Sequence, residues 1–375
     1  MKIGVNGRFL LKPFTGIGQY TKNLLREMAL SSGDRDEYVV LVPEKLPEKM
    51  SVGFGKNVTF VVLPERKLGL AGAKKTWWEQ IQVPEKFVKE CVDVAFFPYP
   101  SNPWTKDWYK RDVKTVVTVH DCIPWQDKRY LRGVLSKMYH GQSRRAVGLA
   151  DKILTVSGSS MKDIVEVCGV DKAKIEVVYN DADAVYKEAP EKKYCETVLS
   201  RFGLKDEQFV LYVGGYDERK NVKGLIEEWK KWEKFPLVLA GGKVMGGKLY
   251  KSFEASAGGG VVKTGFLSED ELNVLYRKCL FFINLSGAEG FNLPILEAAN
   301  CGAGMILSDI PVHREVAEDS ALFAKTSVKG SVGKAMDKML DEKFRKDLKK
   351  KDEVLAKKYS WKKYGAMVRK IFAAI

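Results

Sequence analysis

The chain of 375 residues carries a formal net charge of +15, and 45% of its residues are hydrophobic. This length is more than one hydrophobic core usually fills, so two globular domains are expected. No apolar run approaches the roughly 18 residues of a membrane-spanning helix, and the six cysteines lack the spacing of a metal or redox site. The basic excess favours anionic partners, but the sequence contains no helix-turn-helix, zinc-finger or RNA-binding motif, so nucleic acid is not an expected partner.

Short β-branched runs alternate with segments of helical length along the chain. Such alternation is typical of a parallel α/β architecture. The polar segment 181–194 separates two series of runs and is the expected linker between two domains. Strands are predicted, in chain order, at residues 2–6, 38–42, 58–63, 93–97, 115–120, 152–157 and 175–179, and then at 209–214, 237–240, 261–265, 280–285 and 304–308.

The N-terminal strand starts at the second residue and leaves no room for a signal peptide, so a cytoplasmic protein is expected. Gly4 and Gly7 resemble the opening of a dinucleotide-binding dehydrogenase. However, Phe9 and Leu10 occupy the region where the later glycines of G-x-G-x-x-G should fall. The fingerprint is incomplete, and the sequence does not favour a dehydrogenase.

The residues Gly16, Ile17 and Gly18 stand just before a predicted helix. Glycines let the backbone approach a phosphate closely, and a helix N-terminus attracts anions. On this pattern alone, a flexible turn without a ligand is an equally good interpretation.

Two tryptophans, Trp77 and Trp78, follow Lys74 and Lys75. Indole rings and lysines favour a membrane–water interface, which makes this stretch a candidate contact with an anionic membrane surface. A helix that faces the core of the first domain is the alternative.

His120 ends an apolar predicted strand and precedes Asp121. Active sites of open parallel sheets gather at the carboxyl ends of their strands, so this position makes His120 a candidate functional residue. A structural role is the alternative, and it is the commoner one for a lone histidine.

Arg219 and Lys220 follow the strand at 209–214 and begin another predicted helix. Two cations at a helix start oppose the helix dipole, so helix stability does not explain them. A bound anion would explain them, and a solvated basic turn is the alternative.

Glu289 and Glu297 flank the beginning of a helix. Glu289 is expected in the loop after the strand at 280–285, and Glu297 in the first turn of a helix that begins at Pro294 and ends at Gly302. The backbone N–H groups of residues 290–293 would then lie near the positive end of the helix dipole. Amides, a dipole and two carboxylates at a strand's carboxyl end suit a sugar diphosphate. An acidic loop followed by an ordinary helix is the alternative.

The whole stretch resembles the Glu-x7-Glu signature of the family 4 retaining glycosyltransferases, usually written E-G-F-G-L-P-x-x-E-A. The loop departs from it only at Asn292, where the pattern has Gly, and Asn also tolerates a positive φ. The resemblance implies the GT-B fold, in which two doubly wound Rossmann-like domains face each other across a cleft. It implies an acceptor-binding domain at 1–185, a donor-binding domain at 190–358 and a C-terminal helix, 360–375, that crosses back to the N-terminal domain.

The resemblance also implies roles for individual residues. Lys220 matches the family's phosphate-binding lysine, whereas the preceding arginine position falls on Gly215 or Tyr216, so Arg219 is the candidate substitute. His120 would contact the transferred sugar, Glu289 would orient it, and Glu297 would hold the ribose hydroxyls. The residues expected to bind the donor are Gly16, Ile17, Gly18, Gly265, Phe266, Leu267, Gly290, Phe291, Asn292, Leu293 and Glu297.

The reaction that this resemblance implies is the transfer of a hexose, with mannose favoured, from a GDP- or UDP-linked donor with retention at the anomeric carbon. The acceptor would be a glycan or a lipid-linked glycan. No cofactor and no metal are expected. Asp181 to Asp183 has the D-x-D spacing of a metal–diphosphate site but lies in the linker, so it is discounted. Two alternatives remain open: a catalytically inactive nucleotide-sugar or phospholipid-binding protein of the same fold, and a short glucan phosphorylase.

Overall fold

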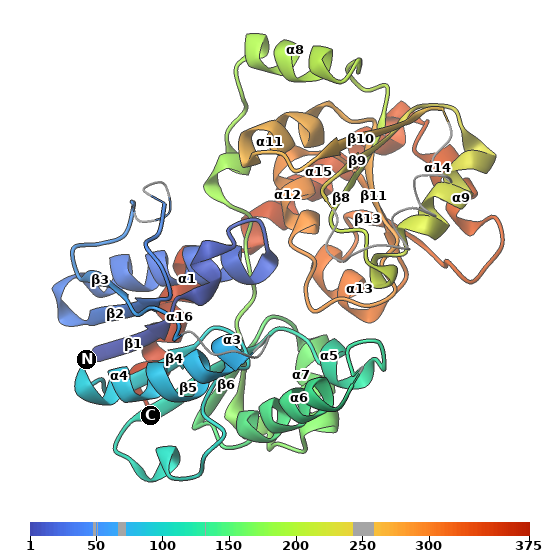
Figure 1. The fold of residues 1–375 in the computed structure, drawn as a ribbon. Helices are drawn as coiled ribbons and strands as arrows, with labels where there is room; N and C mark the ends of the chain where they lie inside the picture. Colours follow the sequence, from blue (N-terminus) through green and yellow to red (C-terminus); the bar gives the residue numbers. More distant parts are fainter. Residues whose placement is uncertain (48–49, 51, 67–72, 132, 243–258) are drawn as a thin grey trace. The chain divides into compact units, whose positions relative to one another are not determined.

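The computed structural model describes residues 1–47, 50, 52–66, 73–131, 133–242 and 259–375 (Figure 1). The chain forms two compact units. Unit 1 comprises Met1–Asn180 and Ser360–Ile375, and unit 2 comprises Asp181–Tyr359. No helix in the described ranges is both long enough and apolar enough to cross a membrane.

Unit 1 is built on a seven-stranded parallel sheet with the order β3-β2-β1-β4-β5-β6-β7. Each of these strands overlaps a predicted run, and their ends differ from the predicted ones by at most two residues. The strands are β1 (Lys2–Asn6), β2 (Glu37–Val42), β3 (Val58–Val62), β4 (Val94–Phe97), β5 (Lys114–Val119), β6 (Lys152–Thr155) and β7 (Ile175–Val177).

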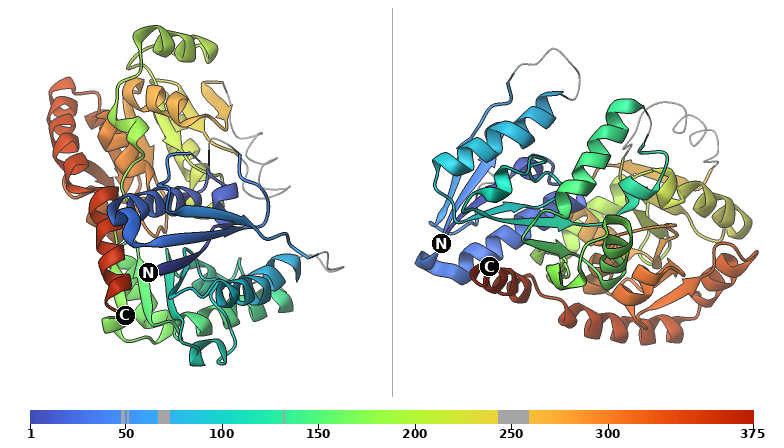
Figure 2. Two further views of the ribbon diagram at one scale, coloured as in Figure 1. Left: turned by 90° about the vertical axis from the view of Figure 1, so that its left-hand side faces the viewer. Right: turned by 90° about the horizontal axis from the view of Figure 1, so that it is seen from below.

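Helices cover both faces of this sheet, as Figure 2 shows. Neighbouring residues of a strand point to opposite faces. Phe96 of β4 therefore meets Phe372 of the C-terminal helix, with ring centroids 5.3 Å apart, while Phe97 meets Phe87 on the other face, at 6.0 Å. The helices of unit 1 are α1 (Gly16–Ser32), α3 (Ala73–Trp77), α4 (Val83–Lys89), α5 (Ile123–Gln126), α6 (Val134–Val147), α7 (Gly158–Cys168) and α16 (Trp361–Ala373).

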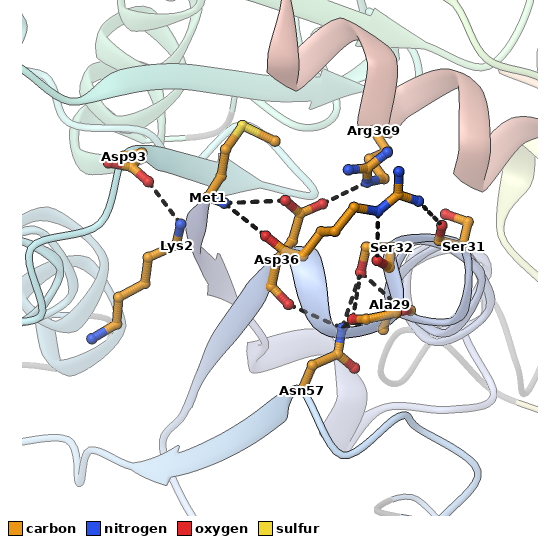
Figure 3. A network of polar contacts seen from close by, with 11 residues as sticks. Met1, Lys2, Ala29, Ser31, Ser32, Asp36, Asn57, Asp93 and Arg369 are labelled. Atoms are coloured by element: carbon orange, nitrogen blue, oxygen red, sulfur yellow. Dashed lines mark hydrogen bonds and ion pairs between the residues drawn. The ribbon is translucent and has the colours of Figure 1, made fainter.

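The C-terminal helix α16 packs beside α1 and thereby returns the chain to unit 1. Its Arg369 Nε lies 2.6 Å from the buried carboxylate of Asp36, and the other oxygen of Asp36 lies 3.1 Å from the amino group of Met1 (Figure 3). Gly365 allows this close packing, because a Cβ at that position would lie 2.6 Å from Cβ of Glu27. The predicted return of the terminal helix is confirmed.

Unit 2 holds a six-stranded parallel sheet with the order β10-β9-β8-β11-β12-β13. Its predicted strands are all present, and β13, a short run of small and apolar residues, was not predicted. The strands are β8 (Val210–Val213), β9 (Leu237–Ala240), β10 (Val261–Gly265), β11 (Phe281–Asn284), β12 (Met305–Ser308) and β13 (Ala321–Ala324). The helices are α8 (Lys192–Arg201), α9 (Val222–Trp232), α11 (Glu269–Lys278), α12 (Pro294–Cys301), α13 (Pro311–Ala317), α14 (Ser331–Lys338) and α15 (Glu342–Lys358).

In each sheet, the order in which successive strands are added reverses at one point. The order of connections changes between β1 and β4 in unit 1, and between β8 and β11 in unit 2. Loops that leave the carboxyl ends of the two strands at such a point diverge and open a crevice, where ligands of doubly wound folds bind. The residues that follow β8 and β11 are therefore the expected position of a ligand-binding site in unit 2.

Candidate functional site

The two loops at the switch point of unit 2 are joined through Glu289. Nζ of Lys220 lies 2.6 Å from Oε1 of Glu289, and Arg219 Nη1 forms an ion pair with Oε2. Arg219 Nη1 also donates to the carbonyl of Ala288 at 2.9 Å, while the Arg219 carbonyl accepts from the N–H of Gly287 at 2.8 Å. One carboxylate thus meets two cations that lie about 70 residues away along the chain.

This arrangement corrects the interpretation of Arg219 and Lys220 as the start of a helix. They belong to a short 3-10 turn, Glu218–Lys220, and α9 begins after it at Val222. Their side chains are only 19% and 13% exposed, so a solvated basic turn is also wrong. The anion that holds them in this structure is the protein's own Glu289.

Electrostatics keep Glu289 ionised. Burial alone would raise its pKa, but the charges of Lys220 and Arg219 outweigh burial and lower the pKa to about 2. The carboxylate therefore stays charged at every physiological pH.

The loop after Glu289 turns sharply into α12, as the sequence predicts. Pro294 is the first helical residue, and Gly302 ends the helix with a φ of 63°. Asn292 adopts a φ of 75°, the conformation that the glycine of the family pattern would take easily. In the part of the chain that the structure describes, the N–H groups of Asn292 and Leu293 have no acceptor.

His313 supports this turn from α13. Its Nε2 lies 2.9 Å from Nδ2 of Asn292, and its Nδ1 lies 3.0 Å from Oγ of Ser308. An amide NH2 only donates, so Nε2 accepts and Nδ1 carries the proton. Burial lowers the pKa of His313 to about 4, which keeps the ring neutral. Sequence analysis did not connect His313 with the loop, because the contact spans two elements.

Glu297 lies in the first turn of α12 and accepts a hydrogen bond from the hydroxyl of Tyr276, at 2.8 Å. Burial is the main cause that raises its pKa to about 7, and the nearby carboxylates of Glu269 and Asp183 raise it further. Tyr276 is fully buried on α11. It carried no signal in the sequence, because only its position in the fold brings it to Glu297.

The segment Gly265–Leu267 closes β10 and leads into α11. Gly265 has a φ of 71°, Leu267 is buried, and the side chain of Phe266 is 65% exposed. The three predicted donor-binding residues therefore form one turn at the carboxyl end of a strand, the edge that also carries Glu289.

In unit 1 the Gly16–Gly18 stretch differs from its prediction. These residues are the first turn of α1 and do not form a loop before it. Thr15 caps the helix and accepts from the N–H of Gly18 at 3.1 Å. A Cβ on Gly18 would lie 2.2 Å from the carbonyl oxygen of Lys12, so packing within this turn already requires a glycine there.

His120 follows β5 and is held between two elements. Its Nε2 lies 2.8 Å from the carbonyl oxygen of Pro98, and its ring meets Tyr20 edge-on with centroids 4.7 Å apart. A carbonyl oxygen only accepts, so Nε2 carries the proton and Nδ1 is the acceptor. Burial lowers its pKa to about 4. His120 is thus a neutral, oriented ring at the carboxyl end of a central strand.

The indole of Trp78 lies in the core of unit 1. It is fully buried and donates to the carbonyl of Leu63 at 2.6 Å, so it does not contact a membrane surface. Lys75, in the same stretch, lies 3.6 Å from the buried carboxylate of Glu79. The alternative of a core-facing helix is correct for Trp78, and Trp77 remains 38% exposed.

The D-x-D spacing has a local explanation. Asp181 pairs with Lys187 at 2.5 Å, and Asp183 accepts from the N–H of Val185 at 3.3 Å. Among the described residues, no three His, Cys, Asp or Glu side chains lie together in a way that could hold a metal ion.

Two family models match the chain. "Glycosyltransferase Family 4" matches residues 14–184, and "Glycosyl transferases group 1" matches residues 200–354. Together they cover both units and the candidate site.

Bacterial mannosyltransferases are among the relatives by sequence. The chain is 30% identical over 287 residues to the serotype-specific mannosyltransferase WbdA of Escherichia coli. This match covers 72% of this chain but only 34% of WbdA. It is 26% identical to the O-antigen chain mannosyltransferase B of Escherichia coli over 93% of both chains. The chain thus spans about a third of WbdA and nearly the whole of the second relative.

The fold resembles that of the solved Anabaena protein HepE in complex with UDP and glucose. The TM-score is 0.74, with 13% identity over 100% of this chain and 99% of HepE. This likeness, together with the two parallel doubly wound sheets, confirms the predicted GT-B fold class. With both family models matched, the chain belongs to the family 4 glycosyltransferases and is similar to the mannosyltransferases that build bacterial O-antigen.

Proposed function

We propose that this protein transfers a hexose, with mannose favoured, from a nucleoside diphosphate sugar to a hydroxyl group of a glycan or lipid-linked acceptor, with retention at the anomeric carbon. The observation that carries the proposal is the pairing of Glu289 with Lys220 and Arg219 beside the N-terminus of α12. Relatives named as mannosyltransferases support the sugar, and a UDP-bound fold neighbour supports a nucleotide donor.

The diphosphate is the group whose charge grows when the sugar–phosphate bond breaks. Fixed cations and helix amides stabilise such charge without rearranging. The Lys220 ammonium carries three N–H donors, and Oε1 of Glu289 takes one of them. We assign the diphosphate to the remaining donors of Lys220, to Arg219 and to the amides of Asn292 and Leu293.

Glu289 and Glu297 have separate tasks in this proposal. Glu289, held ionised by its two cations, accepts from hydroxyl groups of the hexose. Glu297, one turn into α12, accepts from the ribose hydroxyls, and Tyr276 orients its carboxylate. The acceptor oxygen forms the new bond to the anomeric carbon, the bond to the diphosphate breaks, and the acceptor's proton leaves with the phosphate oxygen.

Unit 1 contributes two predicted features, the first turn of α1 and His120. The neutral ring of His120 has an acceptor at Nδ1, which suits a sugar hydroxyl. We propose that unit 1 binds the acceptor, that no metal is required, and that the protein works in the cytoplasm.

A donor screen followed by a transfer assay tests the proposal. A ligand at about 100 times its Kd stabilises the folded state by roughly 2.7 kcal/mol, so thermal shifts with GDP-, UDP-, dTDP- and ADP-sugars should identify the donor. Transfer should persist in EDTA, and NMR of the product should show the donor's anomeric configuration. Glu297→Gln should raise the donor KM, while Glu196→Gln, on the exposed face of α8, should leave it unchanged.

Different outcomes of these assays would exclude different parts of the proposed function. If no sugar nucleotide binds, the donor assignment is wrong. Binding without hydrolysis or transfer would favour the catalytically inactive alternative, which the mannosyltransferase relatives do not favour. Strict dependence on Mn²⁺ would contradict metal-independent chemistry, and an inverted product would contradict retention.

A further inference from the structure

The first turns of α6 expose three large apolar side chains together. Val134 is 73% exposed, Leu135 78% and Met138 59%. The opposite side of the helix, with Ser143, Ala146 and Val147, is buried in unit 1. Steps of 100° per residue bring Val134 and Met138 to one face, with Leu135 at its margin. Isolated exposed apolar residues are ordinary, whereas three on adjacent turns form a patch.

The same helix carries only positive charge. Lys137, Arg144 and Arg145 are exposed. Within the described part of the chain, none of the three forms an ion pair. The sequence between Asp127 and Asp151 holds six lysines and arginines and no acidic residue. The helix therefore combines an apolar patch with a basic margin.

We propose that this face of α6, defined by Val134, Leu135, Lys137, Met138, Arg144 and Arg145, binds an anionic lipid bilayer. A helix lies in the bilayer interface when its apolar side chains enter the acyl boundary while its lysines and arginines meet anionic headgroups. A second copy of the chain would bring the same positive charges together, so charge opposes self-association through this face. An acidic soluble protein would satisfy the charges but would not require the aliphatic patch.

The choice of partner rests on the proposed function, since a lipid-linked acceptor is presented at a bilayer. The chain runs from His120 through α5 to Val134, so the apolar turn is the end of α6 nearest in sequence to the candidate residue of unit 1. As the candidate membrane contact, this surface of α6 takes the place of the Trp77–Trp78 stretch, because the indole of Trp78 is buried.

Vesicle binding by the full chain tests the proposal. Wild-type protein should sediment with phosphatidylcholine vesicles that contain phosphatidylglycerol, and much less with phosphatidylcholine alone. Leu135→Asp should weaken this binding about tenfold or more, because an apolar side chain no longer enters the interface. The matched control is Val354→Asp: Val354 is 72% exposed on the lysine-rich α15 and should bind like wild type.

A second variant tests the charge. Replacing Lys137, Arg144 and Arg145 by Gln should weaken binding to the anionic vesicles about a hundredfold and reduce its salt dependence. These side chains are exposed, so the variant should fold normally, and donor binding should match wild type in all the variants.

Four results would overturn the proposal. Three of them concern vesicle binding: wild-type protein fails to bind the anionic vesicles, Leu135→Asp binds them as tightly as wild type, or Val354→Asp loses as much binding as Leu135→Asp. The fourth result is a wild-type dimer that dissociates in Leu135→Asp. The last would identify an interface between chains. If vesicle binding depends on Leu135 but no sugar nucleotide binds, the surface stands and the proposed function fails.

Discussion

The hydroxyl of Tyr276 donates to the carboxylate of Glu297 across 2.8 Å, from a ring that is fully buried between elements of unit 2. Tyr276 packs edge-on against Tyr186 and Phe282, with ring centroids 5.9 and 5.5 Å away. The direction in which Glu297 can accept a ligand's hydroxyl is therefore set by a residue that itself touches no solvent.

Tyr276→Phe should raise the donor KM about tenfold with a smaller change in kcat, because a hydrogen bond to a charged group contributes about 1.5–3 kcal/mol. The hydroxyl also lowers the pKa of Glu297, so its loss should move the acid limb of the donor KM profile to higher pH. Tyr359→Phe is the control, since that hydroxyl donates to the carbonyl of Val316, at 3.2 Å. An unchanged pH profile would remove Tyr276 from the site.

Glu289→Gln should lower the free energy of unfolding by about 3 kcal/mol, because Lys220 and Arg219 lose the buried carboxylate that both of them pair with. The exposed pair of Asp206 and Lys278 offers the control, and Asp206→Asn should cost less than about 1 kcal/mol. Pyrophosphate should raise the Tm of Glu289→Gln more than that of wild type, since it supplies an anion to Lys220 and Arg219. Equal shifts would argue against a phosphate site at these cations.

The stability of wild type should fall between pH 5 and 8 by about 2 kcal/mol more than that of Glu297→Gln. A pKa raised to about 7 means that the folded state binds the proton more tightly than the unfolded state. The stabilisation is therefore complete below the unfolded pKa near 4.5 and is lost as the pH rises through 7. Urea unfolding at both pH values measures it, and parallel pH curves would contradict the assignment.

Asn292→Ala should destabilise the protein by about 1 kcal/mol more than Asn292→Gly. Both changes remove the contact with His313, but only alanine resists the φ of 75°. Asn292→Gly restores the residue of the family pattern and should remain active. Thermal unfolding of the two variants decides the question, and equal Tm values would show that the backbone is not the limiting factor.

Two glycines in helices should respond oppositely to alanine. Gly365→Ala should cost about 1–3 kcal/mol, because the new Cβ would lie 2.6 Å from Cβ of Glu27 and push α16 away from α1. A Cβ added at Gly333, on α14, would meet nothing within 4 Å. Gly333→Ala should therefore raise the free energy of unfolding by about 0.5 kcal/mol through helix propensity. A stable Gly365→Ala variant would show that the two helices tolerate separation.

The sequence by itself predicted the alternation of strands and helices and the turn into α12, whereas the return of the last helix was implied by the family resemblance. The first two features depend on local patterns: β-branched runs, Pro294 at a helix start, Gly302 at its end and Asn292 where φ is positive. The strand that was not predicted, β13, is four residues long and contains two alanines. A run this short has too little periodicity to separate it from a loop.

Only the tertiary structure decided which side chains meet. Parallel pairing of β8 with β11 brings the turn at Arg219 and Lys220 to Glu289, and no local pattern encodes a contact across about 70 residues. Likewise Tyr276 and His313 serve the site from other helices, Trp78 turns into the core, and α6 keeps Leu135 in solvent. Sequence periodicity specifies a face of each element, whereas the packing of elements determines what that face contacts.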